Sequence, residues 1–396
     1  MVITDVKYYP IKVRSNAKGG VYWFLLKMET EEGISGWGEI IWNAYSPMTL
    51  GEMVKDIAHN YFLGESPFNI EKIFQKAFFV QCKCHTDLAT QGILSGFEIA
   101  CWDIIGKKCG QPIYNLMGGL VNERIRAYTY IYEKEDRIFC EDFWTMSESC
   151  AARAKEYVDM GFTAVKLDPF APYLDDYATH IPRRESLEKA VKTIRLIRES
   201  VGENVDILIG THGQFTGAGA VMVAEAIAPY HPLWFEEPTP PENFPVLTKV
   251  SNEIRVPIAT GERLATKFEF ATLINQKCCD IYQLDISGCG GIFEAKKIAA
   301  MAEANHTMIT THFWAGPINF AAQLNLAASC PNFLIQEAIE TMSGGFGGFE
   351  KIMDDSFVFD KGYFIPPQKP GLGIEINEEK VKKYIVTSYD DKNILI

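Results

Sequence analysis

The chain has 396 residues, of which 47% are hydrophobic and 22% charged, a composition typical of globular proteins that bury a large core. Its 38 Lys and Arg against 51 Asp and Glu give a formal net charge of −13, which argues against binding to nucleic acid or to anionic membranes. A small anionic substrate is still compatible with this charge, since a local cation can reverse the potential inside a cleft. The length exceeds that of most single domains and predicts two packed units.

The sequence also carries signals about location. No run reaches the roughly 18 consecutive apolar residues that a membrane span needs, and the first residues lack the pattern of a signal peptide. The ten Cys are scattered, as expected for reduced thiols in a cytoplasmic protein. The group Cys82-Lys83-Cys84-His85 lacks the second ligand pair that a zinc site usually needs, so we expect it to be buried or to line a loop.

Residues 1–125 are predicted to form a mixed α+β unit. The run 21–29 has the composition of a strand, a Glu-Glu-Gly turn signal follows, and 34–41 is a return strand interrupted by glycines. Apolar residues recur at helical spacing over 95–106, and Gly110 offers a helix stop.

From residue 126 to about 355, short runs rich in Val, Ile and Leu alternate with amphipathic helical segments. Eight such repeats close a parallel barrel, so we predict an α/β fold: a (β/α)8 barrel of the TIM type, capped by the α+β unit. We assign the last segment, 356–396, back to the capping domain. The barrel strands are expected at 126–131, 164–166, 207–209, 233–235, 257–259, 281–284, 308–310 and 333–335.

A polar or charged residue follows nearly every predicted barrel strand. Five of the six successive spacings between these residues are 23 to 27 positions, the length of one strand–helix repeat. Because the carboxyl ends of barrel strands surround one mouth, where active sites of this fold lie, we expect the side chains to converge. The residues are Lys166, His212, Glu236, Glu262, Asp285, His312 and Glu337.

The residue types at these positions suit proton abstraction next to a carboxylate. Glu236 and Glu262, on adjacent strands, offer the oxygen ligands that Mg²⁺ prefers, and the cation would stabilise the enediolate formed when the α-proton leaves. His312 is the natural base near neutral pH, and Asp285 is placed to orient its ring. Each residue also has an ordinary interpretation: a buried structural His, a helix-capping Asp285, a surface Glu or a salt-bridging Lys166.

With these residues the sequence resembles the enolase superfamily, in its mandelate racemase/muconate lactonizing enzyme-like branch. The closest resemblance is to acid-sugar dehydratases of the galactonate type, which place a His-Gly pair where His212-Gly213 stands. The resemblance extends over essentially the whole chain. Its motifs are Gly36-Trp37-Gly38-Glu39, Ala100 to Gly106, Glu236-Glu237-Pro238, Thr260 to Leu264, Gly288 to Ile292, His312 to Pro317 and Pro370 to Gly373.

The resemblance implies roles for the residues of the constellation. Glu236 and Glu262 would bind Mg²⁺, and Asp285 and His312 would form the catalytic dyad. Glu337 would hydrogen-bond the substrate carboxylate, and Lys166 would neutralise it. Loops of the capping domain would close over the substrate, and a homo-oligomer is expected. Candidate specificity contacts in the capping domain are Trp23, Trp42, Tyr45 and His85.

The sequence departs from the family pattern at two positions. The family places a third carboxylate ligand where Gly210 stands, and Asp206, at the start of that strand, is too distant to substitute. His212 shares the inward face with position 210, so it becomes the third ligand or water fills the gap. Racemases of this branch carry a second Lys where Asp168 stands, which favours dehydration, although this carboxylate can also serve as a second base.

We therefore expect a Mg²⁺-dependent dehydratase of an aldonate or aldarate that yields a 2-keto-3-deoxy acid. In this hypothesis His312 removes the α-proton, Lys166 helps to hold the enediolate, and His212 protonates the departing 3-hydroxyl. A racemase, an epimerase or a lactone cycloisomerase would use the same half-reaction. A catalytically silent protein that binds acid sugars is the alternative of another class.

Overall fold

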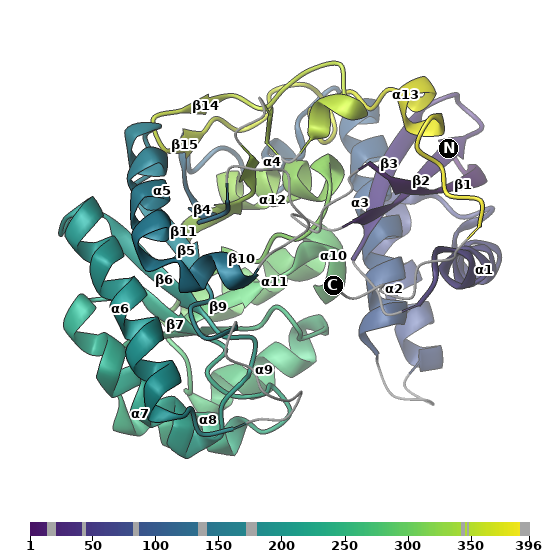
Figure 1. The fold of residues 1–396 in the computed structure, drawn as a ribbon. Helices are drawn as coiled ribbons and strands as arrows, with labels where there is room; N and C mark the ends of the chain where they lie inside the picture. The colour runs from purple at the N-terminus through teal and green to yellow at the C-terminus, as the bar shows by residue number, and fades with distance from the viewer. Residues whose placement is uncertain are drawn as a thin grey trace.

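A computed structural model describes residues 1–13, 21–41, 45–81, 87–133, 141–171, 180–341, 345–346 and 348–388. Two bodies pack side by side: a parallel barrel surrounded by helices, and a capping domain of three strands with helices against them (Figure 1). Within these residues no helix is long and apolar enough to cross a lipid bilayer.

The capping domain is built on an antiparallel sheet in which β2 lies between β1 and β3. The predicted strands and the helix with its Gly110 stop are all present, and Gly110 adopts the left-handed C-cap conformation, with φ of 65°. Glycine is required within β3, because a Cβ at Gly38 would lie 1.8 Å from the carbonyl oxygen of Gly96 on the packed helix. The elements are β1 (Ile3–Lys12), β2 (Tyr22–Thr30), β3 (Ser35–Ile40), α1 (Pro47–Ile57), α2 (Ile70–Gln81), α3 (Leu88–Cys109) and α4 (Ile113–Leu116).

In the described chain, eight parallel strands follow one another around the barrel in sequence order, and β11 closes it by pairing with β4. This confirms the predicted fold, with strand positions close to those expected from the apolar runs. The strands are β4 (Ile125–Tyr130), β5 (Ala164–Leu167), β6 (Asp206–Gly210), β7 (Trp234–Glu236), β8 (Ile258–Thr260), β9 (Ile281–Leu284), β10 (Met308–Thr311) and β11 (Phe333–Ala338).

Helices connect successive strands and cover the outside of the barrel (Figure 1). One buried cluster draws a single residue from most of the strands, among them Tyr128, Leu208 and Trp234. Because strand residues alternate between faces, the residues two positions later on these strands also point inward, nearer the mouth. The helices are α5 (Ser147–Asp159), α6 (Arg184–Val201), α7 (Gly217–Ile227), α8 (Phe244–Glu253), α9 (Thr266–Gln276), α10 (Ile286–Cys289), α11 (Gly291–Ala304) and α12 (Pro317–Ser329).

The segment after the barrel contacts both bodies. The strands β14 (Phe359–Asp360) and β15 (Tyr363–Phe364) form a hairpin, and β15 pairs antiparallel with the start of β4. Farther on, α13 (Glu378–Lys382) leads to residues that bond β1: the amide of Lys12 donates to the carbonyl of Tyr384 at 3.0 Å. The segment thus touches the barrel before it returns to the capping domain.

Two buried carboxylates of the capping domain bond to barrel helices. Glu39 accepts hydrogen bonds from the amides of Gly316 (2.6 Å) and Asn319 (2.9 Å) at the start of α12. Glu98 accepts from the amides of Ile292 (2.7 Å) and Phe293 at the start of α11. These amides belong to the first helical turn, which has no intrahelical acceptor for them, so the capping domain supplies the missing partners.

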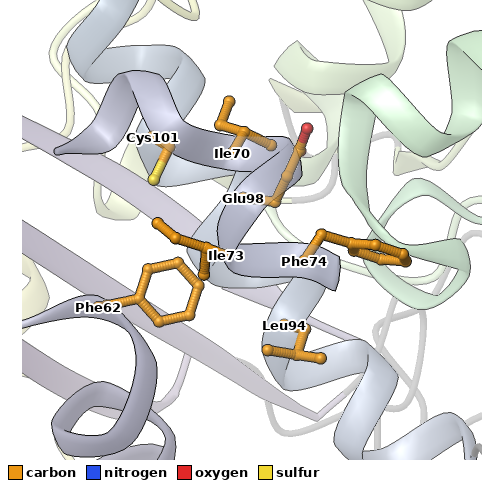
Figure 2. A pocket seen from close by; sticks show the side chains of 7 residues that line it. All are labelled: Phe62, Ile70, Ile73, Phe74, Leu94, Glu98 and Cys101. Carbon is orange, nitrogen blue, oxygen red and sulfur yellow. The ribbon is translucent and has the colours of Figure 1, made fainter. Parts of the chain in front are cut away.

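Glu98 also borders a small hollow between α2 and α3, shown in Figure 2. Its other lining residues are Phe62, Ile70, Ile73, Phe74, Leu94 and Cys101. None of them belongs to the polar constellation predicted from the sequence, so the hollow is a feature of the capping domain's packing.

Candidate active site

The buried pair His312 and Asp285 lies at the carboxyl ends of neighbouring strands β10 and β9. Nδ1 of His312 is 2.8 Å from Oδ2 of Asp285. The other oxygen, Oδ1, accepts from the amide and the hydroxyl of Ser287 at 2.8 and 2.6 Å. Because an ionised carboxylate only accepts hydrogen bonds, Nδ1 carries a proton and Nε2 is left for chemistry.

Glu262 is the nearest carboxylate to the outer nitrogen of this imidazole, with Oε2 of Glu262 3.9 Å from Nε2 of His312. That oxygen has no hydrogen-bond partner within the described residues, although the residue is only 7% exposed. Burial alone lowers the pKa of His312, but the charges of Glu262 and Asp285 outweigh it and raise the pKa to about 9. The ring therefore holds a second proton at neutral pH until those charges are offset.

Lys166, on β5, lies among carboxylates in the barrel interior. Its Nζ is 2.5 Å from Oε1 of Glu236 and 3.2 Å from Oε1 of Glu337. Burial opposes the positive charge, but the surrounding carboxylates raise the pKa of Lys166 well above its ordinary range. Glu337 is further held by the amide of Phe313, which donates to Oε2 at 2.7 Å. A charged ammonium is thus fixed within a cluster of buried carboxylates.

His212 and Asp168 form a second imidazole–carboxylate pair on the β5–β6 side of the mouth. Nδ1 of His212 is 3.0 Å from Oδ2 of Asp168, and the His212 side chain is 50% exposed while the carboxylate is buried. His212 adopts a φ of 47°, which is unusual for a residue other than glycine, and such backbone strain clusters at functional sites. Desolvation lowers the pKa of His212, but Asp168 dominates and raises it to about 10.

The donor set suits a hard divalent cation in part. Glu236 and Glu262 are buried carboxylates from adjacent strands, and Glu262 has the unpartnered oxygen that a ligand would need. Among the residues described, no three His, Cys, Asp or Glu side chains already gather around one point. Both oxygens of Glu236 are already bonded, Oε1 to Nζ of Lys166 at 2.5 Å and Oε2 to Nε1 of Trp234 at 2.9 Å, so within this pair the open ligand oxygen belongs to Glu262, and Mg²⁺ would need water to complete its shell.

The predicted constellation is brought together, whereas only two of the four candidate specificity contacts, Trp23 and Tyr45, lie within the described residues. Trp23 is buried on β2 with its indole edge-on to Phe349 at 5.9 Å between ring centroids, a packing role within the core. Tyr45 is half exposed. Trp42 and His85, with the Cys82–Cys84 group, lie outside the described residues.

Sequence reasoning passed over residues that support the site. Glu237 is buried and bonds the Arg263 guanidinium, with Oε1 accepting from Nε at 3.1 Å and Oε2 2.8 Å from Nη2. Glu237 directly follows the predicted metal ligand Glu236, and Arg263 directly follows Glu262, so their positions in the sequence could have indicated a role beside the site. Tyr130 was also missed: its ring lies 4.7 Å from Nζ of Lys166, and its hydroxyl is 3.3 Å from Oδ1 of Asp168.

Comparison with known proteins identifies relatives along nearly the whole chain. The chain is 34% identical over 369 residues to a D-gluconate/D-galactonate dehydratase from Picrophilus torridus, spanning 93% of this chain and 90% of that protein. It is 31% identical to a D-galactonate dehydratase from Pectobacterium atrosepticum, over 96% of this chain and 94% of that one. A solved mandelate racemase/muconate lactonizing enzyme-like protein from Roseovarius sp. TM1035 superposes with a TM-score of 0.92 at 40% identity, covering 98% and 97% of the two chains.

Two family matches account for most of the sequence. Residues 1–118 match the N-terminal domain of mandelate racemase and muconate lactonizing enzyme. Residues 149–380 match the enolase C-terminal domain-like family. The chain therefore belongs to the mandelate racemase/muconate lactonizing enzyme family of the enolase superfamily.

Proposed function

We propose that this protein is a Mg²⁺-dependent lyase that removes water from an acid sugar, an aldonate or aldarate, to give a 2-keto-3-deoxy acid. The observation that carries the proposal is the buried His312–Asp285 pair, which lies beside Glu262 in the same barrel mouth as the cation Lys166 and its paired carboxylate Glu236. The names of the relatives, dehydratases of gluconate and galactonate, support the same substrate class.

In this proposal His312 removes the proton from the carbon next to the substrate carboxylate. Its Nδ1 proton stays on the hydrogen bond to Asp285, so Nε2 is the atom that accepts the substrate proton. Asp285 stabilises the charged ring that results, and Ser287 fixes the orientation of Asp285.

The substrate carboxylate would bind beside Lys166, whose charge offsets the negative charge that grows as the α-proton leaves. Glu337, held by the amide of Phe313, would hydrogen-bond the substrate carboxylate, the two carboxyl groups sharing one proton. Glu236 and Glu262 are the residues that would hold Mg²⁺, which when bound would supply further charge stabilisation.

His212 would donate the proton that the departing 3-hydroxyl needs. It follows β6, whereas His312 follows β10, and these strands are four places apart in the closed order of eight strands. The two imidazoles therefore stand on opposite sides of the mouth, which suits a base and an acid acting on the two ends of a C2–C3 bond.

The opposed imidazoles also favour a second candidate function, epimerisation at C2, in which His212 returns a proton on the other face. The two reactions differ in product. A dehydratase forms a 2-keto acid, whereas an epimerase in deuterated water places deuterium at C2 of the recovered acid and forms no keto product.

A panel of aldonates and aldarates incubated with the protein and Mg²⁺ tests the proposal. We expect at least one acid to yield a 2-keto-3-deoxy product, and His312→Asn to abolish its formation. A panel without keto product, or an active His312→Asn variant, would overturn it. Calorimetry of acid binding addresses the silent-binder alternative, which requires equal affinity in Mg²⁺ and in chelator.

A further inference from the structure

We infer that Asp168 and Gly210 act together as a positioning device for His212, which sets one ring nitrogen for acid–base chemistry. The inference rests on the proposed function for the step that His212 performs, but the contact itself is a property of the free protein. It gives a role to both positions at which the sequence departs from its family.

The Asp168 carboxylate is buried, being 3% exposed, and is satisfied on both oxygens. Oδ2 is 3.0 Å from Nδ1 of His212, and Oδ1 accepts from the Tyr130 hydroxyl at 3.3 Å. An ionised carboxylate has no proton to donate, so Nδ1 of His212 is the donor. The ring is thereby held with Nε2 as its free nitrogen, on a side chain that remains half exposed to the mouth.

This contact exists only because position 210 has no side chain. Asp168 extends from the end of β5 across the end of β6, where Leu167 and Ile209 are paired in register. A Cβ built at Gly210 would lie 2.0 Å from Oδ1 of Asp168, far inside van der Waals contact. Its φ is outside the left-handed region, so the glycine is needed for space and not for backbone conformation.

The result is two imidazole–carboxylate pairs that follow strands on opposite sides of the closed barrel. His312 is held by Asp285 at 2.8 Å, and His212 by Asp168 at 3.0 Å. In each pair the carboxylate follows the strand before that of the imidazole: Asp285 follows β9 and His312 follows β10. Asp168 likewise follows β5 and reaches His212 after β6 by passing over Gly210. Both rings therefore present Nε2 with Nδ1 bonded, the arrangement that lets a His exchange protons without changing tautomer.

Proton NMR of the free protein tests the contact without any substrate. We expect two strongly downfield imidazole N–H resonances, one lost in His312→Asn and the other lost in His212→Asn. Asp168→Asn and Gly210→Ala should each remove the His212 resonance and retain the His312 resonance. Asp206→Asn is the matched control, since that carboxylate bonds Arg126 at 2.7 Å at the opposite end of β6, and it should retain both.

Kinetics with the acid sugar found active then separate positioning from structural support. In Asp168→Asn we expect kcat for dehydration to fall by about 100-fold or more while KM changes by less than about threefold. Deuterium from solvent should continue to enter C2, because that half-reaction uses His312. A 3-deoxy-3-fluoro analogue, whose leaving group needs no proton, should lose far less rate than the hydroxy acid.

Three results would overturn the inference: a His212 resonance that survives Asp168→Asn, equal losses for the hydroxy and fluoro substrates, or Mg²⁺ affinity that falls by tenfold or more in Asp168→Asn. The last, measured by calorimetry with Mg²⁺ alone, would make Asp168 a metal ligand. If no acid sugar is turned over, the proposed function fails, while the resonances still decide the inference.

Discussion

Replacing Glu98 by Ala should weaken the connection between the capping domain and the barrel. Glu98 accepts three short hydrogen bonds: from the indole of Trp102 (2.7 Å) and from the amides of Ile292 (2.7 Å) and Phe293 (2.9 Å). An unpartnered buried donor costs about 1–3 kcal/mol. The two amides at the start of α11 therefore predict a loss of about 2–6 kcal/mol in the free energy of unfolding.

Urea unfolding followed by fluorescence and circular dichroism measures this loss, provided that both probes report one transition. Glu98→Gln keeps an acceptor oxygen and should lose less than half as much. The matched control is Glu65→Ala, whose carboxylate pairs with Lys72 at the surface and should cost under about 1 kcal/mol. A Glu98→Ala protein within 0.5 kcal/mol of the wild type, on the order of a neutral surface substitution, would refute the reasoning.

Three further predictions follow. Burial raises the pKa of Glu98 to about 8 from its ordinary 4.5, so between these pH values the folded protein holds a proton that the unfolded chain releases. The free energy of unfolding should therefore fall as pH rises through this range, with Glu98 contributing a slope of up to about 1.4 kcal/mol per pH unit. Unfolding titrations of Glu98→Gln should lack this contribution. Lys166→Met leaves two buried carboxylates without their cation and should lower the unfolding free energy by about 3–5 kcal/mol, where an unchanged urea midpoint would contradict the paired geometry. Chelation should abolish keto-acid formation and added Mg²⁺ restore it, while turnover that persists in chelator would exclude a required metal.

The barrel could be predicted because its strands are buried on both faces and are therefore apolar runs of fixed spacing. The run expected at 207–209 is found as β6 (Asp206–Gly210), and the run expected at 281–284 matches β9. The convergence of the polar residues after those runs follows from the closed barrel alone, since every strand ends at the same mouth.

Contacts between elements that are distant in sequence could not be read in this way. Glu39 stands in a recognisable motif, and Glu98 is a carboxylate in the largely apolar run of α3, but nothing local identifies the partners of either residue on another domain. The Asp168–His212 contact has the same origin. In the sequence, Asp168 and Gly210 are two separate departures from the family pattern. Only the pairing of β5 with β6 shows that the missing side chain of Gly210 leaves the space that the Asp168 carboxylate occupies.

The segment that follows the barrel has a consequence for the order of folding. The first residues of β4 find their antiparallel partner in β15, and β1 finds backbone partners near Tyr384. During synthesis both edges are made well before the segment that covers them, so each stays open as an unpaired strand edge in the interval. These two edges are therefore protected from self-association only after the segment that follows the barrel has been synthesised and has folded onto them. Truncation of this segment should expose both edges at once.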